Sequence, residues 1–343
     1  MKQNNIEGDE MAIGRLASSA MIAAVLLAGG GLAHAQDGKQ EGKQDSKLTV
    51  MVFPGMQNLP LFAAQANGLF ARRGLAVDIK MAPSSDEQRA GLADGRWQII
   101  HAGIDNAVAM MEVAKVDIAI ICGGDNSFNH LVVQGDIKSF ADLRGKTMAV
   151  DAPDTAYAFQ LYEILKRNGV PKSDYAVKPV GATIKRLAAM QDDKAVAGTM
   201  MNPPFSLLAM KGGMRDLGAA ATLIGAYQAT GGAVLRSWAK ANPDVLARYL
   251  QAYVEGLRWA LDPRNKDAAI KLFADNLKLA PEIAAATYAV AADPAGGMAR
   301  DAGFDLEGFK NVLKLRADWT GAVPGAPDTY LDLSYYQKAL AGL

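Results

Sequence analysis

The sequence has a single cysteine among its 343 residues, Cys122. One cysteine excludes a disulfide within the chain and a metal site made of cysteines alone. Cys122 lies in an apolar run just before Gly123 and Gly124, with no basic neighbour that would activate a thiol. We therefore expect a buried, unreactive side chain.

The sequence also lacks an excess of charge of either sign, because 36 Lys and Arg balance 36 Asp and Glu. A chain without an overall positive field is not a general binder of nucleic acid or of anionic membranes. Half of the residues are apolar and 21% are charged, which excludes a disordered or collagen-like protein. The length allows two domains of ordinary size.

Sequence motifs for catalysis are missing as well. There is no G-x-S-x-G or H-E-x-x-H motif, and no G-x-G-x-x-G follows a predicted strand. The G-K-T triplet at 145–147 resembles the end of a phosphate-binding loop, but Phe140 stands where that loop requires its first glycine. We interpret His101 and His130, at predicted strand ends, as structural residues. We expect no catalytic residue, no metal and no cofactor, and hence a protein that is not an enzyme.

No apolar run reaches the roughly 20 residues needed to span a bilayer. A shorter run at 20–28 follows Arg15 and precedes an A-x-A sequence that ends at Ala35, a pattern typical of a cleaved signal peptide. We predict a signal peptide over 1–35, cleaved after Ala35. Met11 is the expected start, because the acidic residues before it do not suit a signal. No cysteine follows for lipid attachment, so the predicted location is the periplasm.

After the signal, residues 36–47 are polar and are predicted to form a flexible tether. From Leu48 onward, short β-branched or apolar runs alternate with helical stretches in two successive sets, which is typical of βα units on mostly parallel sheets. The first predicted helix covers 59–70 and is ended by Gly74. After about Tyr227 nearly every segment has a helical pattern. We predict two α/β lobes, with a helical C-terminal tail packed on the first.

Polar and aromatic residues cluster just after the predicted strands in both sets, and open α/β sheets bind ligands at such strand ends. Each cluster precedes a helix, whose free N–H groups and positive dipole end would point between the lobes. Asp105, Asp154 and Thr155 are equally well explained as helix caps, and each aromatic is more often a core residue than a ligand contact. The candidate ligand-binding residues are Phe53, Met56, Gln57, Asp105, Asn106, Asp125, Asn126, Asp154, Thr155, Tyr157, Asn202, Phe205 and Tyr227.

The strand-end loops contain no Arg or Lys, but they do contain Asp105, Asp125, Asp151 and Asp154. Carboxylates that line a closing cleft repel an anion at short range. Aromatic rings suit a flat or cationic group. We therefore predict a neutral or cationic ligand, such as an amine or a pyrimidine-like heterocycle. A sulfonate or taurine-type anion is the alternative.

Several ordered motifs carry a family resemblance. Residues 59–70 (LPLFAAQANGLF) and 74–78 (GLAVD) resemble the opening of periplasmic substrate-binding proteins of the taurine, aliphatic sulfonate, nitrate and thiamine-pyrimidine importer group. Residues 139–150 resemble that group's entry to its second lobe, and Asn202-Pro203-Pro204 its strand exit. Residues 242–260 resemble its tail helix.

The resemblance implies a type II periplasmic-binding-protein fold, in which two α/β lobes are joined by two crossing strands. Lobe one would comprise 48–128 and 229–343, and lobe two 129–228, with crossings near 129–133 and 227–235. The implied partners are a small-molecule ligand and the permease subunits of an ABC importer, with a monomeric protein that neither spans the membrane nor binds nucleic acid. A secreted enzyme of the porphobilinogen deaminase type, or a sensing partner of a membrane receptor, remains an alternative.

Overall fold

The computed structural model describes residues 46–343. The predicted signal peptide and residues 36–45 of the predicted tether lie outside the described residues. The first strand, β1 (Ser46–Val52), begins two residues before the predicted Leu48. Ser46 and Lys47 therefore belong to the sheet rather than to the tether, because they pair with Leu75 and Ala76 of the neighbouring strand.

The sheet of lobe one has five strands in the order β2, β1, β3, β10 and β4. Strand β1 runs parallel to both of its neighbours, whereas β10 runs antiparallel to both of its own. The bounds are β2 (Leu75–Met81), β3 (Ile99–Gly103), β4 (Ile118–Asp125) and β10 (Thr230–Leu235).

The sheet of lobe two repeats this arrangement in the order β7, β6, β8, β5 and β9. Strand β6 is parallel to β7 and β8, and β5 is antiparallel to β8 and β9. The bounds are β5 (His130–Val133), β6 (Thr147–Val150), β7 (Ala176–Pro179), β8 (Val196–Met201) and β9 (Arg215–Ala219). The antiparallel strands β10 and β5 hold the same place in their two sheets, the fourth in each order. Each is the first strand that the chain forms after it crosses from the other lobe.

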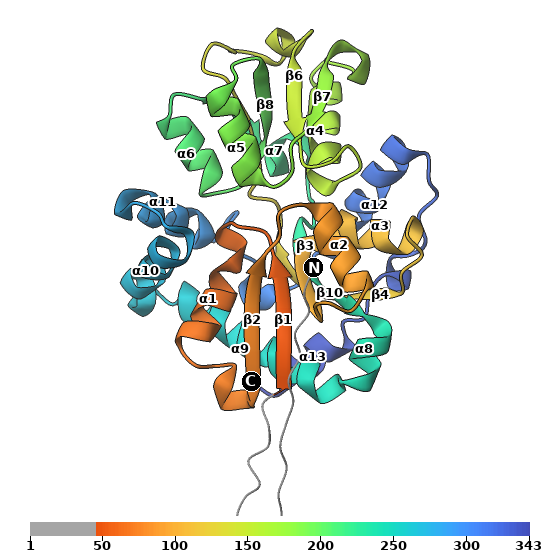
Figure 1. Ribbon diagram of the computed structural model, residues 1–343, viewed down its shortest axis with the longest axis vertical. Coiled ribbons are helices and arrows are strands. Elements are labelled where there is room, and N and C mark those ends of the chain that lie inside the picture. The colour runs from red at the N-terminus through yellow and green to blue at the C-terminus, as the bar shows by residue number, and fades with distance from the viewer. Residues whose placement is uncertain (1–45) are drawn as a thin grey trace, which may run out of the picture. The chain divides into compact units, whose positions relative to one another are not determined.

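The chain passes between the lobes twice. Residues 126–129 connect β4 to β5, and residues 225–229 connect α7 (Ala220–Ile224) to β10. Figure 1 shows the two sheets one above the other along the long axis of the molecule, each with its own helices. The predicted α/β fold is confirmed. The two crossings are irregular segments rather than the predicted strands, and each begins a few residues earlier than predicted.

Helices cover both sheets. Those of lobe one are α1 (Leu59–Ala66), α2 (Ser85–Ala93), α3 (Ile104–Glu112), α8 (Arg236–Ala241), α9 (Pro243–Leu261), α10 (Lys266–Leu277), α11 (Pro281–Ala291), α12 (Leu306–Thr320) and α13 (Ser334–Ala341). Those of lobe two are α4 (Ala156–Arg167), α5 (Thr183–Asp192), α6 (Phe205–Lys211) and the short α7. None of the helices within 46–343 is both long and apolar enough to cross a bilayer.

The first helix is shorter than its predicted 59–70 span. Helix α1 ends at Ala66, because the Asn67 side chain bonds Ala63 O at 2.8 Å and Gly68 takes a left-handed φ of 64°. Glycine reaches that conformation without steric cost, which makes it a common residue just past a helix end. Gly74 ends only the short turn that follows.

The tail helix α9 packs closely on α1. A Cβ at Gly256 would lie only 2.4 Å from Pro60 O, so a side chain there would push the two helices apart. Tyr249 and Tyr253 of α9 are buried beneath the sheet. Burial of each such large side chain contributes roughly 1.5–3 kcal/mol.

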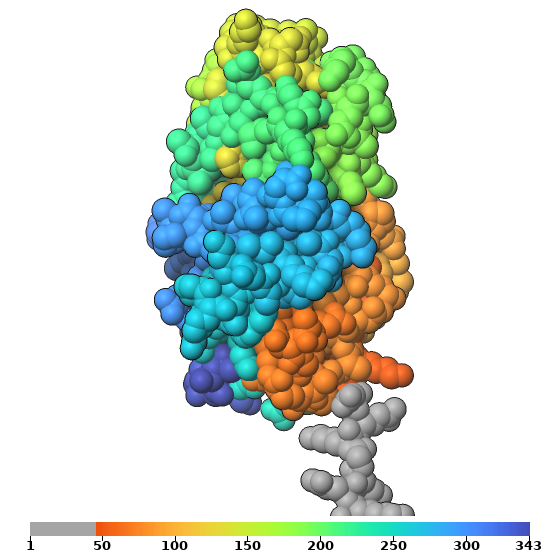
Figure 2. Space-filling view, turned by 90° about the vertical axis from the view of Figure 1, so that its left-hand side faces the viewer, coloured from red at the N-terminus to blue at the C-terminus, as the bar shows by residue number. Residues whose placement is uncertain are grey.

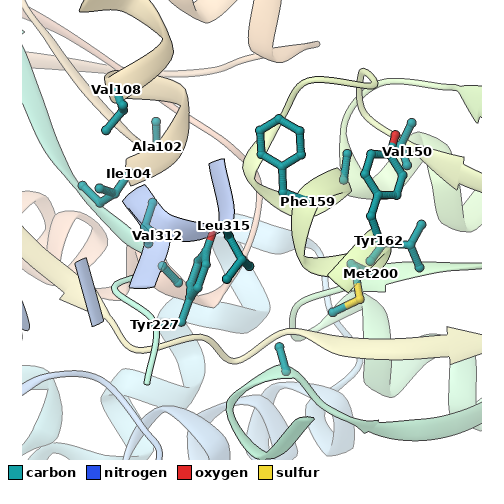
Figure 3. Close-up of a cluster of buried hydrophobic side chains, with 14 of the residues drawn as sticks. Ala102, Ile104, Val108, Val150, Phe159, Tyr162, Met200, Tyr227, Val312 and Leu315 are labelled. Atoms are coloured by element: carbon teal, nitrogen blue, oxygen red, sulfur yellow. The ribbon is translucent and has the colours of Figure 1, made fainter. Parts of the chain in front are cut away.

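Helix α12 packs on both lobes, not on lobe one alone. Figure 3 shows Val312 and Leu315 of α12 in one buried cluster with Ile104 from lobe one and Phe159 from lobe two. The Trp319 ring of α12 also meets Tyr162 of α4 edge-on, with ring centroids 5.4 Å apart. A continuous apolar core therefore joins the lobes on this side.

On another side the lobes meet through α11. Figure 2 shows the segment that carries α10 and α11 lying across the boundary between lobe one and lobe two. Lys211 of α6 and Glu282 of α11 form an exposed ion pair of 2.6 Å there. Water screens an exposed pair of this kind and it contributes little to stability, so this contact is weaker than the apolar core at α12.

Candidate functional site

A cavity lies between the two lobes at the ends of their parallel strands. The cavity has a volume of about 40 Å³ and is open to solvent. This is room for a few water molecules or a small organic group. The lining residues are Phe53, Gln57, Ser85, His101, Ala102, Gly103, Asn106 and Thr230 from lobe one, and Asp151, Thr155, Tyr157, Ala182, Thr183, Arg186 and Asn202 from lobe two.

Direct hydrogen bonds hold the lobes together at one end of the cavity. Asn202 Nδ2 of lobe two donates to Gln57 Oε1 of lobe one at 2.9 Å. Beside it, the Met56 backbone N–H donates to Pro203 O at 3.0 Å. The lobes are therefore closed over the cavity in this conformation.

A second set of interlobe contacts involves the starts of α2, α3 and α4. Asn106 Oδ1 accepts from the Ala156 backbone N–H at 3.1 Å, so a lobe-one side chain satisfies the first turn of a lobe-two helix. The Ser85 hydroxyl donates to Asp151 Oδ2. Gly103 at the end of β3 lies against the same turn, where a Cβ would come 2.8 Å from Ala156 Cβ.

Arg186, on the first turns of α5, is the positive group of the cavity. Its side chain is 1% exposed and donates to Gly181 O at 2.8 Å, Thr183 Oγ1 at 2.9 Å and Met200 O at 3.1 Å. The guanidinium lies over the Tyr157 ring, 5.5 Å from its centroid. Within residues 46–343 its Nε has no hydrogen-bond partner.

Asp151, directly after β6, is the negative group of the cavity. Its Oδ2 accepts from Ser85, while its buried Oδ1 has no partner in the described chain. Burial lowers the pKa of Arg186, and the nearby Asp151 charge opposes that shift. Within the part of the chain that the structure describes, the two side chains bond other groups and not each other.

His101 borders the cavity from β3 but is held toward α9. Its Nε2 lies 2.8 Å from Tyr249 Oη, and its ring stacks on Tyr253 with centroids 4.7 Å apart. Burial lowers the pKa of His101 to about 4, so the ring is neutral at pH 7. This environment is that of a packed structural histidine.

The sequence profile of the family described as "NMT1/THI5 like" matches residues 56–266, which is more than half of the chain. The chain belongs to the NMT1/THI5-like family. The match includes both lobes and most of the cavity lining, and it confirms the resemblance found in the sequence. A comparison with curated proteins finds no match.

Solved structures share the fold of this NMT1/THI5-like protein. The ligand-binding component of an ABC-type import system from Staphylococcus aureus has a TM-score of 0.73 at 14% identity, covering 86% of this chain and 99% of that one. The periplasmic nitrate-binding protein NrtA from Synechocystis PCC 6803 has 0.72 at 14%, covering 88% and 89%. The aliphatic sulphonate binding protein SsuA from Escherichia coli has 0.67 at 16%, covering 85% and 99%. At such identities the likeness establishes the fold alone.

The cavity brings together part of the residue set expected from the sequence. Thr155 occupies the N-cap position of α4, but its hydroxyl donates to Ala152 O and accepts no hydrogen bond from the N–H groups of the helix. The expected residues that line the cavity are Phe53, Gln57, Asn106, Thr155, Tyr157 and Asn202.

Several other expected residues lie outside the lining. Met56, Phe205 and Tyr227 are buried among core side chains, and Figure 3 shows Tyr227 beside Leu315. Their apolar rings or chains complete the packing under the loops, in keeping with the core interpretation of such residues. Asn126 is exposed and borders a different hollow with 291–301.

Three of the four carboxylates invoked for ligand charge also lie outside the lining. Asp105 pairs with buried Arg316, and burial raises its pKa to about 6 although Arg316 opposes the shift. Asp125 accepts from the Thr230 hydroxyl and the Ser127 N–H, and burial likewise raises its pKa to about 6. Asp154 is exposed, 3.8 Å from an arginine of α2. Only Asp151 brings its charge to the cavity.

Arg186 is a functional candidate that the sequence prediction did not include, because that prediction rested on the strand-end loops and Arg186 lies inside helix α5. One signal could have found it. The polar turn Gly181-Ala182-Thr183 follows β7, and Arg186 comes one helical turn after Ala182, on the same face. Including the first helical turn after each strand-end loop would have placed it at the cleft.

Proposed function

We propose that this protein is an extracytoplasmic solute receptor that binds a small organic molecule between its lobes and delivers it to an ABC importer. The observation that carries the proposal is a cavity closed by both lobes, in which Arg186, Asp151 and Asn202 each keep a buried polar atom that has no partner among residues 46–343. Buried polar groups are normally hydrogen-bonded, so such atoms favour a bound polar molecule. Membership of the NMT1/THI5-like family supports this function.

The proposed location is the periplasm, and the proposed partners are the permease subunits of the importer. The names of the nitrate- and sulphonate-binding neighbours include the word periplasmic, which supports this location. Cleavage of a signal peptide after Ala35 and a monomeric state stay predictions from the sequence. N-terminal sequencing and light scattering of the exported protein would test them.

The ligand that we propose carries no net charge. The cavity lining combines the cation Arg186 with the anion Asp151, so a purely cationic amine or a purely anionic sulfonate would leave one of them unmatched. An unmatched buried charge costs several kcal/mol. The sequence predicted a neutral or cationic ligand, with an anion as the alternative. Of these three, a ligand without net charge fits this lining best.

A role in binding rather than catalysis is part of the proposal. Cys122 is buried away from the cavity lining, and burial raises the pKa of its thiol to about 12. His101 is neutral and bonded to Tyr249. The fold also occurs in a protein described as desulfurization enzyme DSZB, so the experiment below includes a readout for turnover.

The test is a binding screen on the mature protein, unfolded and refolded to remove any carried ligand. Amines, heterocycles, amino acids, sulfonates and aromatic acids are screened by thermal unfolding. A ligand at 100 times its dissociation constant stabilises by about 2.7 kcal/mol, a rise of roughly 5 °C. We expect one class to produce this rise and to reduce the radius of gyration in X-ray scattering.

Two outcomes would contradict the proposal. Absence of binding in every class, together with no small molecule released from natively purified protein, would remove the receptor function. Chemical conversion of a bound compound, followed by mass spectrometry over hours, would replace it with an enzyme.

A further inference from the structure

The cavity holds two unsatisfied groups of opposite charge that do not satisfy each other. Arg186 Nε and Asp151 Oδ1 are both buried, and neither has a hydrogen-bond partner within residues 46–343. Both side chains line the same cavity from lobe two. Each group has other hydrogen bonds but keeps one polar atom unsatisfied, so a molecule that binds both atoms would satisfy both charges.

Arg186 offers a defined donor set. A guanidinium has five N–H donors, and the structure uses its two terminal nitrogens on Gly181, Thr183 and Met200. These three contacts fix the plane of the group, and Tyr157 supports its face. The Nε–H is therefore left as a charge-assisted donor for the ligand, and an acidic oxygen is its best acceptor.

Asp151 and Asn202 offer the opposite set. Asp151 Oδ1 and Asn202 Oδ1 are buried acceptors without partners in the described chain. The other atoms of both side chains are already used, by Ser85 and by Gln57 respectively. A protonated amine has three N–H donors and a positive charge, so it matches a carboxylate and an amide oxygen together.

We propose that the ligand is a small zwitterion, whose acidic group binds Arg186 and whose protonated amine binds Asp151. The inference rests on the receptor function proposed above and narrows its ligand class. The limited space of the cavity favours a molecule of amino-acid size. Ser85 of lobe one donates to the Asp151 carboxylate of lobe two. This bond can form only when the lobes are closed. Closure therefore orients the carboxylate that would bind the amine.

The test uses matched probes on the refolded protein. ω-Amino carboxylic and ω-amino sulfonic acids of two to five carbons are compared by calorimetry with the corresponding acids that lack the amine and amines that lack the acid. Each missing group removes a charge-assisted hydrogen bond, so we expect the best amino acid to bind about 30-fold or more tightly than either of its analogues. A tightest ligand with only one charge, or with none, would overturn the inference while leaving the receptor function intact.

Variants assign each group to its side chain. Arg186→Met should weaken the amino acid about 30-fold or more and leave the acid-free amine nearly unchanged. Asp151→Asn should weaken binding of the amino acid and leave the affinity for the amine-free acid nearly unchanged. The affinities of these two probes should then differ by no more than about threefold. A purely structural role would weaken every probe equally and would contradict the assignment.

Controls separate recognition from folding. Arg215→Met and Asp136→Asn change exposed residues of the same lobe and should leave all affinities as in the wild type. Arg186→Lys keeps the charge but not the planar donor set, and should retain part of the preference for the acid.

If no probe binds, the small molecule released from natively purified protein is identified by mass spectrometry. A released molecule without both an amine and an acid overturns the inference, and the absence of any released molecule overturns the receptor function with it.

Discussion

Arg316 of α12 forms a buried ion pair with Asp105 of α3, with Nη1 3.1 Å from Oδ2. The same guanidinium reaches Glu112 through Nε at 2.9 Å. Both Arg316 and Asp105 are at most 2% exposed. Since α12 also packs on α4 of lobe two, this pair anchors the helix that joins the apolar cores of the two lobes.

Replacing Arg316 by Met should destabilise the protein by about 3–5 kcal/mol at pH 7.5, because it leaves buried Asp105 and half-buried Glu112 without their cation. The loss should be smaller at pH 5. Burial already raises the pKa of Asp105 to about 6 with Arg316 present, and loss of the cation raises it further. The penalty for the ionised form is therefore present above the folded-state pKa and disappears as the pH falls below it.

Urea unfolding of wild type and Arg316→Met at the two pH values measures this effect. The control is Arg264→Met, since Arg264 is 88% exposed and its ion pair within residues 46–343 is the surface one with Asp262. That change should leave the free energy of unfolding nearly unchanged. A loss for Arg316→Met that is equal at pH 7.5 and pH 5 would contradict the role given to Asp105.

Gly103→Ala should hinder closure without disturbing lobe one. An added Cβ would meet Ala156 Cβ of lobe two at 2.8 Å, whereas its next neighbours, Ala229 O and Asn106 Nδ2, lie at 3.8 and 3.9 Å. Gly103 has an ordinary φ of −58°, so alanine introduces no backbone strain. Forced contacts of this kind cost about 1–3 kcal/mol, which should weaken ligand binding about 5- to 150-fold.

Calorimetry with the ligand found in the screen, together with X-ray scattering, tests whether the lobes close at the contact between Gly103 and Ala156. The variant should keep the melting temperature of the ligand-free protein and show a larger radius of gyration at the same ligand concentration. Gly212→Ala is the matched control, because its Cβ would meet only ordinary contacts of 3.4 and 3.5 Å. Unchanged affinity in Gly103→Ala would show that the lobes do not close along this line.

The alternation of strand and helix patterns was sufficient to predict the two α/β lobes, because burial on both faces of a sheet imposes that pattern locally. Local patterns do not predict which strand lies beside which, and so the antiparallel insertion of β5 and β10 appears only in the structure. Helix α1 ends at Ala66 rather than at the predicted residue 70, because of a side-chain bond from Asn67 and the left-handed backbone of Gly68. Such a bond competes with the helix at an energy too small for a pattern to reveal.

The site was predicted less completely, for a physical reason. Strand-end loops identified Gln57, Asn106 and Asn202, because the sheet geometry places every such loop at the same edge. The charge of the cavity depends instead on which side chains are turned inward. Asp105 is paired by Arg316, more than 200 residues later in the sequence, and Arg186 enters from inside a helix. Neither fact is encoded in the residues nearby.

His101 should make the protein less stable in mild acid. Its pKa is about 4 in the folded state because the ring is buried, against 6.5 as its ordinary value. The unfolded chain therefore binds a proton as the pH falls through 6.5, while the folded protein does not. Stability from the neutral ring is complete above that pH and is lost progressively toward pH 4, by about 2–3 kcal/mol at pH 4.5.

The comparison of wild type with His101→Gln isolates this contribution. Asp105 and Asp125, whose pKa values burial raises to about 6, act in the opposite direction in both proteins, so they cancel in the difference. Glutamine does not titrate and can still bond Tyr249. The difference in unfolding free energy between the two proteins should shift by about 2–3 kcal/mol from pH 7.5 to pH 4.5 in favour of the variant. A constant difference would mean that His101 is solvated and not held by Tyr249.

Cys122 should resist alkylation in the folded protein. The thiol is buried on β4, a Cβ at Gly232 of the neighbouring strand would lie 2.9 Å from its Sγ, and burial raises its pKa to about 12. The thiolate is the reactive form, so both access and ionisation oppose the reaction. Iodoacetamide at pH 8 should modify Cys122 only in denaturant, as followed by intact mass. Rapid labelling of the native protein would instead identify an accessible thiol and would favour the enzyme alternative, because a cofactor-attaching or nucleophilic cysteine has to be exposed in the folded state.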